Sequence, residues 1–152
     1  MKKKYFHLDK IFDKYCLIAI HSNLDDFSLA FLLNKSLGAN FERANESIKY
    51  KNSNFEFFNW EDLKNGINCS LISNKNYMNS EIITKTDSLF SLSETKKVSL
   101  IESMSKVDYL IKIKQGLDLN FTLMILNELP QIILSYTLDD EEIKSKLNLI
   151  FD

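Results

Sequence analysis

The stretch V-D-Y-L-I-K-I-K, residues 107–114, alternates in the way that is typical of a β-strand. Gly116 follows it and predicts the end of that strand. The leucines after this glycine recur at the spacing of one helical face: Leu119, Leu123, Leu126 and Leu129. A strand followed directly by such a helix predicts the first two parts of a strand–helix–strand unit.

The residues around Pro130 predict the third part of this unit. Asp118 or Asn120 is expected to cap the helix at its start. Pro130 is expected to end it, because proline has no backbone N–H and disfavours the helical conformation of the preceding residue. Residues 131–137 are rich in Ile, Leu and Tyr, and they predict a returning strand.

A similar unit is predicted near the beginning of the chain. Residues 15–20, Y-C-L-I-A-I, form the continuous apolar run of a strand that is buried on both faces. Ser22 or Asn23 is expected to cap the following helix. Asp25 and Asp26 would lie in its first turn, where carboxylates interact favourably with the helix dipole.

The end of this helix and the segments between the two units are also predicted. Gly38 stands where a helix stop belongs, and residues 41–44 are expected to form the next strand. Residues 74–96, rich in Asn, Ser, Thr and Lys, are interpreted as a mobile, irregular excursion. Further strands are predicted at 4–8, 55–60, 68–73 and 97–101, with a turn at 63–66 and a short helical turn at 88–92. A short helix is predicted at 139–146, and residues 147–151 are expected to pack back against the domain.

These elements predict one α+β domain over residues 1–152. Strands 15–20, 107–114 and 131–137 are the most apolar, so they are expected to share one sheet. Two strand–helix–strand units side by side favour a ferredoxin-like plan, with one mainly antiparallel sheet, helices on one face and extra strands between the units. The second unit also resembles half of an ACT-type regulatory domain.

Composition and charge argue against several classes of function. The formal net charge is −2 and the pI is about 5.7, so a nucleic-acid partner is not expected. No apolar run approaches the roughly 20 residues that span a bilayer, and the start lacks the apolar core of a signal peptide. Cys16 and Cys69 belong to no C-x-x-C pair. We therefore expect a cytoplasmic protein without a metal site, a cofactor or a membrane partner.

The segment Ile101 to Tyr109, I-E-S-M-S-K-V-D-Y, resembles the signature of the IPExxxVDY proteins, a bacterial family with no assigned activity. In a gap-free alignment Glu102 stands at the family's proline and Ser103 at its glutamate, whereas a one-residue insertion would align Glu102 with the glutamate. The resemblance implies no particular reaction. Further blocks that fit the family are 17–22, 25–26, 32–35, 55–58, 71–75, 107–113, 143–146 and 149–151.

His21, Asp25 and Asp26 form the best candidate for chemistry. His21 ends a buried strand, and the two aspartates follow within a helical turn. A carboxylate beside a histidine can act as a general base or as part of a metal site. In the structural interpretation the aspartates only stabilise the helix start, and His21 hydrogen-bonds a loop backbone. A metal site would need further ligands, and His7 is the only other histidine.

Aromatic residues are the candidates for a contact surface. Phe58 and Trp60 are expected on one face of a strand and Phe57 on the other. Tyr109 begins a strand and is expected in the core or at an interface. An exposed aromatic face would mark a site of contact with a partner. Phe58, Trp60 and Tyr109 are therefore the interface candidates.

The sequence favours a non-catalytic interaction or regulatory protein of unknown protein partner, itself or another, with dimerisation through its sheet as one form. Ser22 has no G-x-S-x-G setting, and the chain has neither a phosphate-binding loop nor a dinucleotide fingerprint. The alternative is a small enzyme or small-ligand-binding domain that uses the His21, Asp25 and Asp26 corner. A pocket at that corner would favour the alternative.

Overall fold

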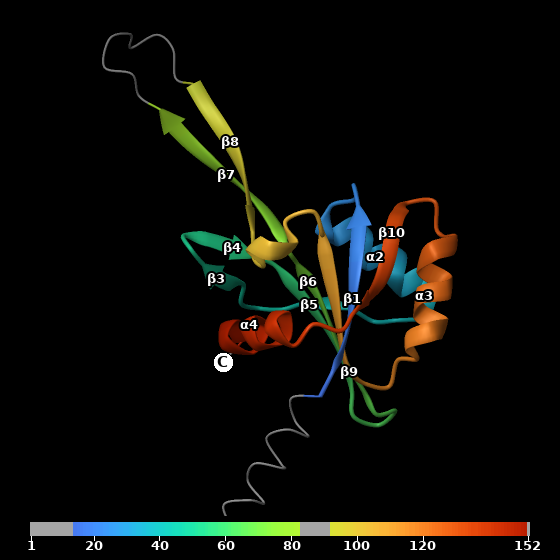
Figure 1. Ribbon diagram of the computed structural model, residues 1–152. Helices are drawn as coiled ribbons and strands as arrows, with labels where there is room; N and C mark the ends of the chain where they lie inside the picture. Colours follow the sequence, from blue (N-terminus) through green and yellow to red (C-terminus); the bar gives the residue numbers. More distant parts are fainter. Residues whose placement is uncertain (1–13, 83–91, 152) are drawn as a thin grey trace, which may run out of the picture.

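The computed structural model of the protein describes residues 14–82 and 92–151, and its centre is a six-stranded sheet (Figure 1). Every pair of neighbouring strands in this sheet is antiparallel. Across the sheet the strands are β10 (Ile132–Leu138), β1 (Cys16–Ser22), β9 (Tyr109–Gln115), β6 (Ile67–Ser73), β5 (Phe57–Asp62) and β2 (Glu42–Arg43). Among the described residues, no helix is both long and apolar enough to span a membrane.

The three strands predicted to share a sheet lie side by side as β10, β1 and β9. Strands β9 and β10 are each antiparallel to β1, so they are parallel to one another. Helix α3 (Leu119–Glu128) connects them, and β1 lies between them. The predicted second strand–helix–strand unit is therefore confirmed.

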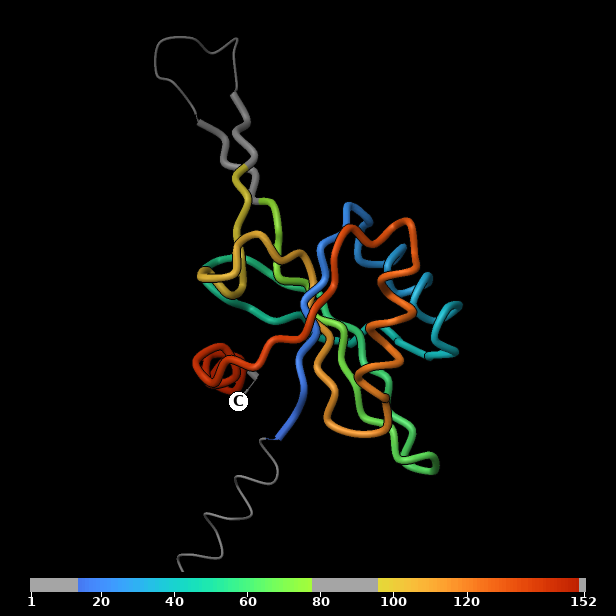
Figure 2. Tube along the Cα trace, turned by 45° about the vertical axis from the view of Figure 1, so that its right-hand side comes forward, coloured from blue at the N-terminus to red at the C-terminus, as the bar shows by residue number. Residues whose placement is uncertain are grey.

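Helices α2 (Asp26–Leu37) and α3 cover one face of the sheet, and α4 (Glu141–Phe151) lies on the other, as Figures 1 and 2 show. The core is correspondingly in two parts. Leu33 of α2 and Leu126 of α3 pack with Ile18 and Ile111 from one face of the sheet. On the second face, sheet residues pack against α4 and the hairpin of β3 (Ile48–Tyr50) and β4 (Ser53–Phe55).

The structure corrects the predicted cap of α2. Asp25, and not Ser22 or Asn23, is the N-cap, and its Oδ1 accepts a 2.7 Å hydrogen bond from the Ser28 backbone N. Ser22 is the last residue of β1. The other helix ends agree with prediction, because Gly38 adopts a left-handed conformation (φ 63°) after α2 and Asp118 caps α3.

The prediction of irregular backbone at residues 74–96 is wrong for most of that segment. Strands β7 (Lys75–Ile82) and β8 (Leu92–Ser99) form an antiparallel hairpin that projects from the body of the molecule (Figure 1). In its register Lys75 is opposite Ser99, and Ile82 is opposite Leu92. The predicted helical turn at 88–92 falls mainly outside the described residues, as does the predicted strand at 4–8.

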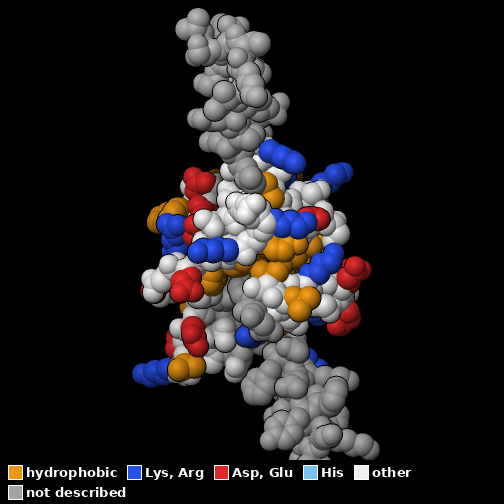
Figure 3. All heavy atoms as spheres, turned by 90° about the vertical axis from the view of Figure 1, so that its left-hand side faces the viewer, with side chains coloured by type: hydrophobic (Ala, Val, Ile, Leu, Met, Phe, Trp, Pro, Cys, Tyr) orange, Lys and Arg blue, Asp and Glu red, His pale blue; other side chains and the backbone are white. Residues whose placement is uncertain are grey.

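The last predicted helix is longer than expected. Helix α4 runs without a break through residues 147–151, which were expected to follow a shorter helix. Its Ile143 and Leu147 are buried in the second part of the core, at 4% and 0% exposure. Figure 3 shows the molecule from the side of α4 and the β3–β4 hairpin, where apolar side chains reach the surface between charged ones.

Candidate functional site

Asp108 joins three segments at the end of β1. Its Oδ2 accepts a 2.8 Å hydrogen bond from the Ser22 backbone N, and its Oδ1 lies 2.9 Å from Lys75 Nζ. Lys75 also donates to the Ser22 carbonyl at 3.3 Å. The side chains of Lys75 and Asp108 are only 16% and 14% exposed, so water screens their ion pair weakly.

Tyr109 holds the loop between β1 and α2. Its hydroxyl donates a 2.6 Å hydrogen bond to the Leu24 carbonyl, and Lys75 Nζ lies 5.6 Å from the centre of its ring. Burial, and then the nearby negative charges of Asp26 and Asp108, raise the pKa of Tyr109 far above its ordinary value. The phenol is therefore protonated at neutral pH and acts as a hydrogen-bond donor.

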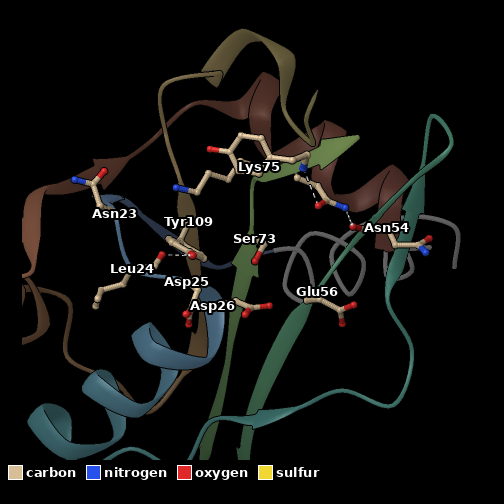
Figure 4. A pocket seen from close by; sticks show the side chains of 11 residues that line it. Asn23, Leu24, Asp25, Asp26, Asn54, Glu56, Ser73, Lys75 and Tyr109 are labelled. Carbon is tan, nitrogen blue, oxygen red and sulfur yellow. Dashed lines mark hydrogen bonds between the residues drawn. The ribbon is translucent and has the colours of Figure 1, made fainter. Parts of the chain in front are cut away.

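A cleft of about 430 Å³ opens beside this loop, between the start of α2 and the hairpins β3–β4 and β7–β8. Figure 4 shows Asp25 and Asp26 at the start of the helix, with Tyr109 and then Lys75 above them and Glu56 and Asn54 to the right. Tyr77 also lines the cleft and is 57% exposed. The full lining is Asn23, Leu24, Asp25, Asp26, Asn54, Glu56, Ser73, Lys75, Asn76, Tyr77 and Tyr109.

The charge balance of the cleft is negative. Lys75 is matched by Asp108, and Glu56 is matched by Arg43 at 2.9 Å. Asp25 and Asp26 form no ion pair with the residues that the structure describes. The hydrogen bond from the Ser28 backbone lowers the pKa of Asp25, which keeps its carboxylate ionised at neutral pH. The mouth of the cleft therefore carries two carboxylates that are not neutralised within the described chain.

His21 is separated from the two aspartates. Residues 18 and 20 of β1 face α2 and α3, so the alternation of the strand places His21 toward the opposite face. There His21 Nε2 lies 3.1 Å from the Tyr136 hydroxyl, and the two rings are 5.6 Å apart. The structure therefore brings Asp25 and Asp26 together at the cleft but does not add His21 to them.

The interface candidates are mostly core residues. Phe58 and Tyr109 are each only 3% exposed and pack in the part of the core that lies under α2 and α3. Trp60 is partly buried and packs edge-on against Phe41 at 5.7 Å. Phe57 faces the other part of the core, as predicted. Tyr109 therefore lies in the core, one of the two places expected for it, and Phe58 is also a core residue.

Sequence reasoning missed Asn74, which organises the signature segment. Asn74 is fully buried, and its Nδ2 donates to the Met104 and Val107 carbonyls at 2.8 and 2.9 Å. Its Oδ1 accepts from the Ile101 backbone N at 2.8 Å. Glu102, by contrast, is exposed and pairs with Lys51 at the surface. An asparagine directly after the apolar strand at 68–73 was the available signal.

The next question is whether the described residues could bind a metal ion. In the described ranges 14–82 and 92–151, no three His, Cys, Asp or Glu side chains are grouped so that they could hold a metal ion.

The comparison of this chain with protein-family models, with curated proteins and with solved structures found no match in any of the three.

Proposed function

We propose that the protein is a non-catalytic interaction protein, and that its cleft receives a cationic side chain of a protein partner. The observation that carries this proposal is the state of the carboxylates at the mouth of the cleft. Asp25 and Asp26 have no countercharge among the described residues, and both line an open cleft. A lysine or arginine of a partner would supply the missing charge.

The other groups of the cleft suit the same kind of ligand. The exposed ring of Tyr77 can lie against a cation, which aromatic faces attract. The side chains of Asn54 and Asn76 add polar groups from two different hairpins. Binding through such exposed charges weakens as salt is added, because the surrounding ions screen them. We therefore expect the interaction to depend strongly on ionic strength.

Three of the groups that could perform chemistry, Tyr109, Asp108 and Asp25, make contacts that hold the fold, which favours binding over catalysis. Tyr109 is protonated and donates to a backbone carbonyl, so it is not available as a base. Asp108 is held by a backbone N–H and by Lys75. Asp25 uses one oxygen to cap α2. These contacts position the cleft and fix its shape.

The proposal is tested with a fluorescently labelled hexalysine peptide as a probe of cation binding. We expect binding at low salt and its loss in the double variant Asp25→Asn, Asp26→Asn, measured by fluorescence anisotropy. Asparagine keeps the N-cap hydrogen bond, so the helix start is preserved. The melting temperature of each variant shows whether the fold is intact.

A matched control separates the cleft from general charge. Glu46→Gln with Glu128→Gln removes the same two negative charges from exposed positions outside the cleft. We expect this control to bind the peptide nearly as the unchanged protein does. Equal loss of binding in both double variants would contradict the proposal, because the peptide would then respond only to net charge.

A second candidate function is the binding of a small polar cation in the same cleft. Its volume of about 430 Å³ lies within the range of small-molecule pockets, roughly 300–1,000 Å³. Spermidine and arginine are suitable probes in a calorimetric titration. Saturable binding of one of them that is lost in the Asp25→Asn, Asp26→Asn variant would favour this candidate over a protein partner.

We also infer the finer classification of the fold and family. The order β10, β1, β9 and then β2, with β5 and β6 inserted before β2, supports a ferredoxin-like or ACT-like plan enlarged by two strands. Membership of the IPExxxVDY proteins is inferred from the signature residues Ile101, Val107, Asp108 and Tyr109. A cytoplasmic location likewise stays a prediction, which fractionation of cells that produce the protein would test.

A further inference from the structure

Strand β10 is an open edge of the central sheet. It has seven residues and pairs with β1 on one side, and within the described residues no strand pairs with its other side. Its sequence, I-I-L-S-Y-T-L, contains no charged residue and no proline. Soluble proteins usually protect an edge strand with such residues, because the free N–H and C=O groups of the edge can pair with another strand.

Apolar side chains accompany this edge. Ile133 is 65% exposed and Leu134 is 50% exposed. On α3, Asn127 accepts a hydrogen bond from Ser135 of β10, and Met124 lies one helical turn before Asn127 on the same side. Met124 is 51% exposed. The free edge therefore has uncovered apolar groups both on the strand and on the neighbouring helix.

The opposite edge of the sheet differs in each respect. Strand β2 has only two residues, Glu42 and Arg43, and both are charged and exposed. A short, charged edge offers little to a second strand. The contrast between the two edges indicates that a partner strand is expected at β10 and not at β2.

We propose that two copies of this chain associate through β10, which forms an antiparallel pair with β10 of the second copy. The backbone edge requires an extended strand, and the second copy presents the same uncharged strand. A two-fold axis makes both copies use one self-complementary surface, and it runs the two strands in opposite directions. The two central sheets then form one continuous sheet.

The charges at the end of β10 support a second copy of the chain as the partner, and they support the antiparallel direction of the pair. An axis near Ser135 places Ile133 opposite Thr137 of the second copy and overlaps the whole strand. Asp139 and Asp140 follow β10 directly. In the antiparallel pair these acids lie beside the neutral start of the other strand. A parallel pair would bring the acids of both copies together, where their like charges would repel.

The area of the proposed interface sets the expected strength of the dimer. Seven residues at about 3.4 Å each give an edge about 24 Å long. Adding α3, a helix about 10 Å across, gives a band about 20 Å wide, or about 500 Å² per copy. The total of about 1,000 Å² belongs to the small, weak interfaces. We therefore expect a dimer that dissociates on dilution.

Sedimentation velocity over a wide range of protein concentration tests the association. We expect the mass to rise from the 17.7 kDa of the single chain toward twice that value. Ile133→Lys places a charge on the edge and should keep the protein monomeric at every concentration. Leu63→Lys is the matched control, because Leu63 is 88% exposed in the turn after β5, and it should dimerise as the unchanged protein does.

Amide hydrogen exchange of the unchanged protein identifies the surface without any variant. The amides of β10 should exchange more slowly at high than at low concentration, and those of β2 should not change. A monomer at all concentrations would overturn the proposal. So would a dimer whose β10 amides are unaffected, or one that Ile133→Lys leaves intact. The proposal rests on β10 and not on the cleft, so either can fail alone.

Discussion

Asp108 shows how one residue of the segment 101–109 holds separate parts of the fold together. It is the residue before β9, and it binds the end of β1 and the start of β7. Its neighbour Tyr109 binds the loop that leads into α2. Removing the Asp108 carboxylate would leave Lys75 as a largely buried charge without its partner, which is costly in a protein interior. Both side chains thus fix the position of Asp25 and Asp26.

The two cysteines make a residue-scale prediction about reactivity. Cys16 is exposed, whereas Cys69 is 1% exposed and burial raises the pKa of its thiol to about 11. Because the thiolate is the reactive form, Cys69 should resist alkylation near neutral pH. We expect iodoacetamide to modify one site in the folded protein, identified by peptide mass spectrometry.

Unfolding the protein in guanidinium chloride provides the control for this experiment. Both cysteines should then react, because the denatured chain exposes both thiols. Rapid modification of Cys69 in the folded protein would contradict the packing of β6 described above.

Single residues also show what sequence could and could not predict. Gly38 was predicted correctly and Asp118 was one of the two predicted caps of α3, because helix caps depend on residues within one turn. Ser22 was misassigned as a cap, since its hydroxyl donates to the Gln131 carbonyl, more than 100 residues away. Such a partner is set by the tertiary fold and leaves no local signal.

At the scale of elements, apolar strands and helices were predictable and polar strands were not. Residues 107–114 carry a strong pattern because both parts of the core cover the faces of β9. The hairpin of β7 and β8 has many Asn, Ser, Thr and Lys residues and projects from the body, so its strands lack the apolar alternation of a core strand. Pairing between its own two strands supplies their hydrogen bonds instead.

Asn74 holds the segment between β8 and β9, so we predict that its substitution destabilises the protein. Asn74→Ala would leave the Ile101 N–H and the Val107 carbonyl without the partner that Asn74 supplies, whereas the Met104 carbonyl keeps its hydrogen bond from the Val107 backbone N. Each unpaired buried group costs about 1–3 kcal/mol. We expect the free energy of unfolding to fall by about 2 kcal/mol or more, as measured by urea denaturation.

Asn45→Ala is the matched control for this variant. Asn45 is exposed, and surface substitutions usually change stability by less than about 0.5 kcal/mol. Asn74→Asp adds a sharper test, because it replaces the donating Nδ2 with an acceptor that faces two carbonyl oxygens. If Asn74→Ala and Asn45→Ala were equally stable, Asn74 would not organise this segment.

At the scale of the whole molecule, the cleft could not be read from sequence because distant segments build it. Asp25 and Asp26 come from the start of α2, Asn54 from β4 and Tyr77 from β7. The sequence did place the two aspartates at a helix start. It grouped His21 with them because they are close in the chain, but strand alternation turns His21 to the other face of the sheet.

The two-layered core makes the last prediction, which concerns α4. Leu147 is fully buried against the sheet, and Leu149, two residues later on the same helix, is 80% exposed. Leu147→Ala should lower the free energy of unfolding by about 2–5 kcal/mol, because it removes buried methyl groups and leaves a cavity. Leu149→Ala should change it by less than about 0.5 kcal/mol. Each variant replaces one leucine of α4 with alanine, so the effect of helix propensity cancels when the two variants are compared. Denaturation curves that coincide for the two variants would mean that α4 does not close the second part of the core.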